Sequence, residues 1–490
     1  MRTDFTEEQR ADPDIAESEK ILRKCTHCGF CTATCPTYLL LGDELDSPRG
    51  RIYLLKNMLA SGTAPSAEAV KHIDRCLSCL ACMTTCPSGV NYMHLVDHGR
   101  RWIEQTYRRP WSERMLRRML GTVLPQPALF RLALRAAALA KPLLPVLPGS
   151  LKPMVALAPP KIPVSAPAER ERVHPAAGER RMRVALLPGC VQPVLAPEIN
   201  AATIRLLTRH GCEVVIAARS GCCGSLNHHL GQEREALARA RANVDAWEHE
   251  RAAGGLDAIL ANASGCGTTL KDYGFMLRED RAYAEKAAAV AALARDVSEL
   301  VSGLGLGAPA ANPGRGLRVA YHSACSMQHG QRLHKLPMTL LAQVGFDVVE
   351  VPEGHLCCGS AGTYNLLQPD LAARLRDRKL ANIASTRANL VATGNIGCIS
   401  QLAGASEVPV VHTVELLDWA TGGPEPPALK RYKGRGRNRA GTSHDSPSAA
   451  APTMLGSSHP AAPAASRSPA APSSTQATVI GSWPSSEPAA

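Results

Sequence analysis

"CTHCGFCTATCP", residues 25–36, recurs as "CLSCLACMTTCP" at residues 76–87, and these two runs decide how the N-terminal part of the chain folds. Both have the spacing CxxCxxCxxxCP, so eight of the 17 cysteines stand in two copies of one pattern. Cysteines this dense in a 490-residue chain indicate metal or cluster binding rather than a disulfide framework. The expected compartment is therefore a reducing one.

The spacing of each run is that of bacterial two-cluster ferredoxins, in which the fourth cysteine of a run serves the other cluster. Soft thiolate sulfur is the ligand that iron-sulfur clusters require. We therefore predict two [4Fe-4S] clusters on crossed ligand sets: Cys25, Cys28, Cys31 and Cys86 for cluster 1, and Cys76, Cys79, Cys82 and Cys35 for cluster 2. Structural zinc sites, the alternative, usually pair two CxxC units and fit this spacing less well.

The residues between the two runs predict helices. In "SPRGRIYLLKNMLASG", residues 47–62, Ser47 can cap a helix, Pro48 suits its first position and Gly62 ends it. The stretch "SAEAVKHIDRC" then leads into Cys76 as a second helix. We expect a mainly helical, ferredoxin-like module over residues 1–100.

A basic segment follows at residues 101–182. Residues 100–183 contain 17 basic and 5 acidic side chains, and this local excess of 12 equals the formal charge of the whole chain, +12. The segment begins as basic helices and becomes a proline-rich stretch, "PLLPVLPGSLKPMVALAPPKIPVSAPAE", which is typical of a linker. A basic helical face favours docking on a partner or on anionic lipid headgroups, with a solvated surface as the alternative.

The C-terminal half repeats itself. "RVALLPGC" at 183–190 matches "RVAYHSAC" at 318–325, and "CCGS" at 222 matches "CCGS" at 357, both at an offset of 135. Short strands alternate with helices in each copy, which predicts a parallel α/β sheet. The predicted fold class is thus α+β and multidomain: the helical module, then two α/β domains at 183–302 and 316–424, here called the first and second CCG domains. "GLGLGAP" at 303–309 is expected to be a flexible connector and residues 425–490 a disordered basic, then Ser/Pro/Ala-rich tail.

The remaining cysteines fall where predicted strands end, and the carboxyl edge of an open α/β sheet is where ligands bind. These candidate metal ligands are Cys190, Cys222, Cys223 and Cys266 in the first CCG domain and Cys325, Cys357, Cys358 and Cys398 in the second. They could hold a further iron-sulfur cluster or zinc, or be small buried hydrophobes. Cys212 lies outside the pattern and is expected in the core.

Several histidines are candidate ligands, although most lone histidines are surface or satisfied core residues. They are His228, His229, His322, His355 and His412, of which His412 is the best placed because it follows an apolar run. The sequence offers no GxGxxG fingerprint, no phosphate loop and no GxSxG elbow. Electron carriers are thus present without a hydride-handling cofactor site, and electrons must come from elsewhere.

The order of these parts resembles the iron-sulfur subunit of glycolate oxidase, also called glycolate dehydrogenase. The resemblance rests on both CxxCxxCxxxCP runs, "SPRGR" and the two CCG motifs, and covers residues 20 to about 420. It implies two [4Fe-4S] clusters on the eight cysteines of the runs, FAD on flavoprotein partner subunits that oxidise glycolate to glyoxylate, and a quinone or other membrane electron acceptor. In related heterodisulfide reductases the motif ends in CxxC, but Cys266 and Cys398 stand without that companion.

Two other functions stay open. One is the iron-sulfur subunit of a lactate or glycerol-3-phosphate dehydrogenase, and the other is a self-contained heterodisulfide or quinone reductase acting at the CCG domains. No nucleic-acid partner is expected, because aromatics are sparse and no base-reading module is evident. The N-terminus lacks a signal peptide and no run of 18 apolar residues appears, so we expect a cytoplasmic protein held peripherally at the inner face of the cytoplasmic membrane.

Overall fold

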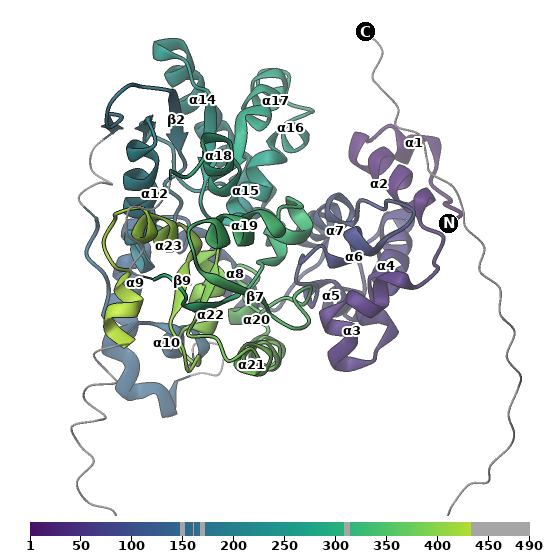
Figure 1. Ribbon diagram of the computed structural model, residues 1–490. Coiled ribbons are helices and arrows are strands. Elements are labelled where there is room, and N and C mark those ends of the chain that lie inside the picture. The colour runs from purple at the N-terminus through teal and green to yellow at the C-terminus, as the bar shows by residue number, and fades with distance from the viewer. Residues whose placement is uncertain (148–151, 160, 167–171, 308–313, 433–490) are drawn as a thin grey trace, which may run out of the picture. The chain divides into compact units, whose positions relative to one another are not determined.

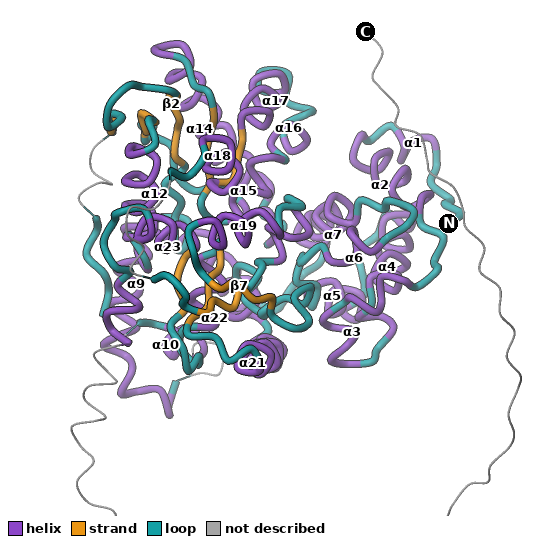
Figure 2. Tube along the Cα trace, viewed as in Figure 1, coloured by secondary structure: helices purple, strands orange, loops and turns teal. Residues whose placement is uncertain are grey.

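A computed structural model describes residues 1–147, 152–159, 161–166, 172–307 and 314–432 of the chain. Helices make up most of it, and the strands form two small sheets in the C-terminal half (Figures 1 and 2). The predicted α+β class, with a helical module ahead of two α/β parts, is confirmed. The predicted disordered tail from residue 433 onward, the last residues of the "GLGLGAP" connector and parts of the proline-rich stretch lie outside the described residues.

The N-terminal module is built from short helices around the two cysteine runs. Its elements are α1 (Glu7–Arg10), α2 (Pro13–Lys24), η1 (Phe30–Thr34), α3 (Pro36–Leu41), η2 (Glu44–Asp46), α4 (Pro48–Ser61), α5 (Ala67–Asp74), α6 (Ala81–Thr85) and α7 (Tyr92–Thr106). One apolar core joins α2, α4, α5 and α7, where Leu22, Leu55, Ile73 and Leu95 are fully buried. The cysteine loops are therefore attached to a packed scaffold.

The helix predicted between the runs is present with its expected ends. In α4 the Ser47 Oγ accepts a hydrogen bond from the Gly50 N–H at 3.0 Å, Pro48 is the first helical residue, and Gly62 closes the helix with φ 65°. Pro48 suits that place because its missing N–H would have no partner there, and Gly62 suits the left-handed cap because it has no Cβ.

The basic segment forms α8 (Trp111–Val123) and α9 (Pro127–Ala140), followed by η3 (Lys141–Val146) and α10 (Lys152–Leu157). Phe130 and Leu134 of α9 are buried together with Ala158 and with Val194 of the first CCG domain. Part of the stretch predicted to be a linker is thus helical and packed. The prolines of this stretch led to the prediction of a linker, but Pro142 is compatible with a helix here. It stands in the first turn of η3, where a missing N–H is tolerated.

The first CCG domain contains a five-stranded sheet of order β1-β3-β2-β4-β5. Its elements are β1 (Val173–His174), β2 (Met182–Leu186), α11 (Gln192–Leu195), α12 (Glu198–Arg209), β3 (Cys212–Val215), α13 (Ser225–His229), α14 (Glu233–Gly254), β4 (Ala258–Ala261), α15 (Ser264–Lys271), α16 (Tyr273–Met276), α17 (Ala284–Leu293), β5 (Ala294–Asp296) and α18 (Val297–Leu304). All pairs are parallel except β1 with β3, an antiparallel edge that the parallel prediction did not include.

The second CCG domain repeats this plan with a four-stranded, fully parallel sheet of order β7-β6-β8-β9. Its elements are β6 (Arg318–Tyr321), η5 (Ser326–Gly330), α19 (Lys335–Gln343), β7 (Asp347–Glu350), α20 (Tyr364–Leu367), α21 (Pro369–Ser385), β8 (Leu390–Thr393), α22 (Ile396–Leu402), β9 (Val410–His412) and α23 (Thr413–Ala420). In both sheets the first long strand is central, so the loops after it and after its neighbours meet at one edge.

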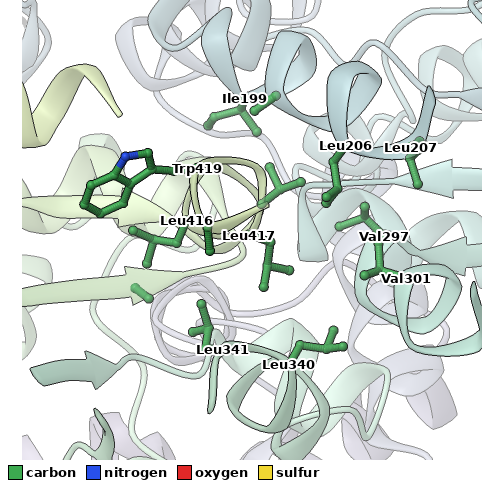
Figure 3. Close-up of a cluster of buried hydrophobic side chains, with 14 of the residues drawn as sticks. Ile199, Leu206, Leu207, Val297, Val301, Leu340, Leu341, Leu416, Leu417 and Trp419 are labelled. Atoms are coloured by element: carbon green, nitrogen blue, oxygen red, sulfur yellow. The ribbon is translucent and has the colours of Figure 1, made fainter. Parts of the chain in front are cut away.

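The two CCG domains share a hydrophobic core. Helices α12 and α18 of the first domain face α19 and α23 of the second, and Figure 3 shows Leu206, Val301, Leu340 and Leu417 among the side chains that meet there. Asp418 of α23 adds ion pairs at 2.8 Å to Arg205 and 2.6 Å to Arg209 of α12. This packing fixes the carboxyl edges of the two sheets with respect to each other.

Candidate iron-sulfur and thiol sites

The two CxxCxxC loops have left-handed residues at the same two positions. In the first, His27 and Gly29 have φ of 59° and 88°, and in the second, Ser78 and Leu80 have φ of 50° and 63°. Left-handed residues two apart turn successive N–H groups toward the inside of the loop, a concave arrangement that favours negative charge. The Ser78 N–H accordingly donates to the Cys76 Sγ at 3.5 Å.

The structure places Cys86, from the second run, with three cysteines of the first run. Cys25 interacts electrostatically with Cys28 and Cys86, and Cys31 interacts with Cys25. All four line one small cavity, together with Cys82 of the second run. The four thiols predicted for cluster 1 therefore lie together, three from the first run and one from the second.

Cys35 is in turn placed with the second run. Cys82 interacts with Cys79, Cys76 and Cys35, and also with Cys31 of the first group. Cys79 interacts with Cys35 and Cys76. Burial raises the pKa of Cys31 to about 11 and those of Cys79 and Cys82 well above the usual value. Metal or cluster binding at these groups must therefore displace protons, which is the usual coupling for thiolate ligands.

A buried polar network supports the second group of thiols. Arg51 of α4 is 1% exposed; its guanidinium lies 3.7 Å from the Cys35 Sγ and donates to the Asp46 carboxylate at 3.1 Å. Asp46 also pairs with Arg75 at 2.8 Å. The Tyr92 hydroxyl donates to the Cys76 Sγ at 3.7 Å. Arg51 is the last residue of "SPRGR", and its contact with Cys35 could not be predicted from any local sequence pattern.

The two groups differ in exposure. Cys28 is exposed, and Phe30 next to it is 63% exposed. The second group is buried against the second CCG domain, where Leu77 and Cys79 share a cluster with Cys357 and Tyr364. Cys79 and Cys325 interact electrostatically across this contact, and Thr84 bonds His329 at 2.7 Å.

Each CCG domain gathers its four cysteines at the carboxyl edge of its sheet. In the first, the thiol of Cys190 interacts with that of Cys222, Cys222 with Cys223 and Cys223 with Cys266, and in the second the same order of interactions joins Cys325, Cys357, Cys358 and Cys398. The Cys325 and Cys357 sulfurs are 3.9 Å apart. Adjacent thiols in this number provide a donor set that suits a cluster or zinc. Cys212, expected in the core, is fully buried away from both rows.

One cavity of about 350 Å³ is lined by all eight of these cysteines. Its opposite wall is apolar and comes from the covering helices α8, α9 and α10, through residues such as Leu120, Phe130, Leu134 and Met154. Leu77 and Ser78 of the second cysteine run reach the same cavity. The ferredoxin-like module and the four cysteines of each CCG domain, here called the two rows of thiols, therefore meet at this one cavity.

The candidate histidines differ in whether the structure gives their rings hydrogen-bond or ion-pair partners. His412, the best placed in sequence, caps α23: its Nδ1 accepts from the Val414 N–H at 3.1 Å and its Nε2 bonds the Asn262 carbonyl oxygen at 2.8 Å. His228 and His229 each lie 3.4 Å from the Asp97 carboxylate of α7. His322 instead lies beside Cys358 and Cys398.

Two family models match the chain. The "4Fe-4S dicluster domain" covers residues 21–90, and the "Cysteine-rich domain" covers residues 184–271 and 319–403. These matches coincide with the two crossed thiol groups and the two thiol rows. The dicluster description agrees with the four-thiol donor sets, because [4Fe-4S] clusters are held by four cysteines.

Relatives of known family extend over most of the chain. It is 45% identical over 421 residues to the glycolate oxidase iron-sulfur subunit of Escherichia coli, covering 86% of this chain and 99% of that protein. It is 32% identical to the probable glycolate oxidase iron-sulfur subunit of Bacillus subtilis, covering 82% and 94%. Lactate utilization protein A of Oceanobacillus iheyensis is 27% identical and matches only 48% of this chain, though 97% of its own length. Because identity of this level spans both thiol groups and both CCG domains, the chain belongs to the family of glycolate oxidase iron-sulfur subunits.

Proposed function

We propose that this chain is the iron-sulfur electron-transfer subunit of a flavoprotein glycolate dehydrogenase complex. The observation that carries the proposal is the pair of crossed four-thiol groups in a chain that is 45% identical to a glycolate oxidase iron-sulfur subunit. Oxidation of glycolate to glyoxylate releases two electrons and two protons. FAD on partner subunits would take them, since this sequence contains electron carriers but no motif for a hydride-accepting cofactor.

In this proposal the eight cysteines of the two runs hold two [4Fe-4S] clusters. Cys25, Cys28, Cys31 and Cys86 hold cluster 1, and Cys76, Cys79, Cys82 and Cys35 hold cluster 2. Bound clusters supply one-electron transfer, which converts a two-electron flavin oxidation into single steps. Arg51 and Tyr92 stabilise negative charge on the Cys35 and Cys76 sulfurs through their contacts with them.

The exposure of the thiols supports a direction of electron transfer, from cluster 1 to cluster 2. The loop that bears Cys28 is at the surface, beside the exposed ring of Phe30, and is the natural contact for a flavoprotein partner. The second group is buried beside the second CCG domain and the shared cavity. Electrons would thus enter near Cys28 and move inward past Cys79.

The apolar cavity and the covering helices support a quinone as acceptor. A quinone takes two electrons and two protons to become a quinol, which balances the oxidation of glycolate. Leu132, Leu139 and Val146 are exposed on α9 and η3 at 62%, 82% and 79%. The exposed Arg118 and Arg135 lie on the same covering helices, and apolar side chains combined with basic ones are typical of peripheral binding to anionic lipid. No helix of the described residues is long and apolar enough to cross a membrane.

Cys28→Ala tests the electron route. The variant should lose about half of the bound iron and lose glycolate-dependent quinone reduction, because one of the four ligands of cluster 1 is gone. Direct reduction of a dye by the flavoprotein subunits should remain. Cys212→Ala, in the core away from both groups, is the matched control. Unimpaired quinone reduction in the Cys28→Ala complex would refute the proposal.

Leu139→Glu tests the membrane surface. We expect wild-type complex to sediment with vesicles that contain anionic lipid and to be released by high salt, since surface charge is screened. The variant should bind several-fold more weakly, whereas Glu279→Ala, on an exposed turn far along the chain from the covering helices, should not change binding. Salt-independent absence of binding by the wild type would exclude the peripheral attachment.

A further inference from the structure

The side chain of His322 is buried without a hydrogen-bond partner. It is 1% exposed at the end of β6, and neither ring nitrogen has a partner among the described residues. Leaving a buried polar group unsatisfied destabilises the folded state, so such groups are rare in folded proteins. A ligand on this ring would remove that destabilisation.

Two sulfurs lie beside the ring. One ligand atom each of His322, Cys358 and Cys398 falls within 4.8 Å of the other two. Sulfurs around a tetrahedral zinc ion lie about 3.8 Å apart, given a Zn–S bond of ~2.3 Å, so a small contraction would close the set. A fourth sulfur is at hand in Cys357, which precedes Cys358 in the chain and whose thiol interacts with that of Cys358.

The first CCG domain has no equivalent of this imidazole. By the repeat offset, His322 corresponds to Leu187. Both residues directly follow the central strand and donate their N–H to the neighbouring strand, Leu187 to Leu260 at 2.9 Å and His322 to Ala392 at 2.8 Å. Leu187 packs with Cys223 in a hydrophobic core. The two rows of thiols thus stand in different chemical surroundings.

A buried ammonium adds a second difference. Lys379 of α21 is 1% exposed, donates to the Glu353 carbonyl oxygen at 2.9 Å and interacts with the thiols of Cys357, Cys358 and Cys398. The carbonyls of Ala236 and Ala372 each lie against the glycine that follows the CC pair of their domain, so these two alanines correspond. Lys379 follows Ala372 at the same distance along the chain as the neutral Asn243 follows Ala236, so Asn243 is its counterpart in the first domain. Zinc with three thiolates and one imidazole carries one negative charge, which this ammonium would compensate.

We propose that the second CCG domain binds one zinc ion through His322, Cys358 and Cys398, with Cys357 as the fourth ligand, and that the first CCG domain cannot build this site. Borderline-soft zinc with mixed imidazole and thiolate ligands is a common structural combination. The site goes beyond the electron route proposed above, which uses only the cysteines of the two runs. Its role is to fix the edge of the second sheet where Cys79 contacts it.

The metal content of the full-length protein tests the site. Purified wild type, dialysed against a chelator, should retain one zinc per chain, whereas His322→Leu, which introduces the residue of the first domain, should retain at least ten-fold less zinc with unchanged iron. His355→Leu, a partly exposed histidine outside the site, should retain zinc. A wild type without zinc, or equal zinc in His322→Leu, would overturn the proposal; loss of iron in that variant would assign the ring to an iron-sulfur cluster instead.

Zinc X-ray absorption on the unmodified protein gives a readout that does not depend on a variant folding. The expected shell contains one nitrogen at about 2.0–2.1 Å and three sulfurs at about 2.3 Å. A shell of four sulfurs, or of nitrogen and oxygen only, would contradict the assignment of His322.

Discussion

At the scale of single residues, Tyr92 offers the cleanest control over cluster 2. Its buried hydroxyl donates to the Cys76 Sγ at 3.7 Å, and hydrogen bonds to sulfur raise cluster potentials. Tyr92→Phe should lower the potential of cluster 2 by about 40 mV, taking ~1 kcal/mol for the bond and 59 mV for each tenfold change in a one-electron equilibrium. A redox titration followed by EPR measures it.

The matched control is Tyr53→Phe, which changes an exposed ring on α4. Both cluster potentials should be the same in Tyr53→Phe as in the wild type. An unchanged potential in Tyr92→Phe would mean that the Cys76 sulfur is not a ligand of cluster 2, or that Tyr92 does not donate to it.

Some site residues could be predicted from sequence and others could not. Cysteine spacing predicted the candidate ligands of each run, because ligand spacing within a loop is a local property, and their binding of clusters stays a prediction. The partners of those thiols, Arg51 and Tyr92, are brought together only by tertiary packing of α4 and α7. His322 and His412 look alike in sequence, each near the end of an apolar strand. His412 finds its partners in the helix that follows β9 and in the Asn262 carbonyl of the first CCG domain, which no local pattern reveals.

At the scale of elements, Gly50 explains the "SPRGR" turn. A Cβ at this position would lie 2.0 Å from the Glu44 carbonyl oxygen, so the first turn of α4 approaches η2 too closely for any side chain. Gly50→Ala should destabilise the protein by about 1–3 kcal/mol, the usual cost of overpacking, and displace Arg51 from Cys35. Chemical denaturation and cluster content measure both effects.

Gly303→Ala is the comparison for that variant. Gly303 stands in α18 with nothing within 4 Å of a Cβ, so alanine there should stabilise the helix by up to about 1 kcal/mol. Equal stability of Gly50→Ala and the wild type would show that η2 moves freely and that the close approach does not hold Arg51 in place.

Element prediction succeeded where caps and periodicity act locally. The ends of α4 followed from Ser47, Pro48 and Gly62, and the alternation of strands and helices gave the parallel sheets. The antiparallel strand β1 and helix α10 were missed, since each is short. Their conformation depends on contacts with β3 and with the cavity wall rather than on their own sequence.

At the scale of the whole molecule, an ion-paired group joins the N-terminal module to the first CCG domain. Burial alone lowers the pKa of His228, but the Asp97 carboxylate outweighs burial and raises it above 6.5. Stability from a raised histidine pKa is fully present below the unfolded value and is lost as pH rises through the folded value. The contact should therefore weaken in mildly alkaline solution.

His228→Gln tests this contact. We expect the variant to be less stable than the wild type by about 1–3 kcal/mol at pH 6, because Asp97 loses a charged partner, with the difference shrinking by pH 9. His249→Gln, on the exposed face of α14, should show no such dependence. Denaturation curves at both pH values measure the difference in the free energy of unfolding between the variant and the wild type. A difference that grows with pH would contradict the ion pair.

The most direct test of the central claim is whether glycolate reduces the clusters of this chain. The tagged chain would be purified anaerobically with the flavoprotein partners proposed above, mixed with glycolate, lactate or glycerol 3-phosphate, and frozen for EPR. The account predicts signals from two reduced [4Fe-4S] clusters with glycolate and not with the other two donors. Clusters that stay oxidised while the partner flavin is reduced by glycolate would contradict it.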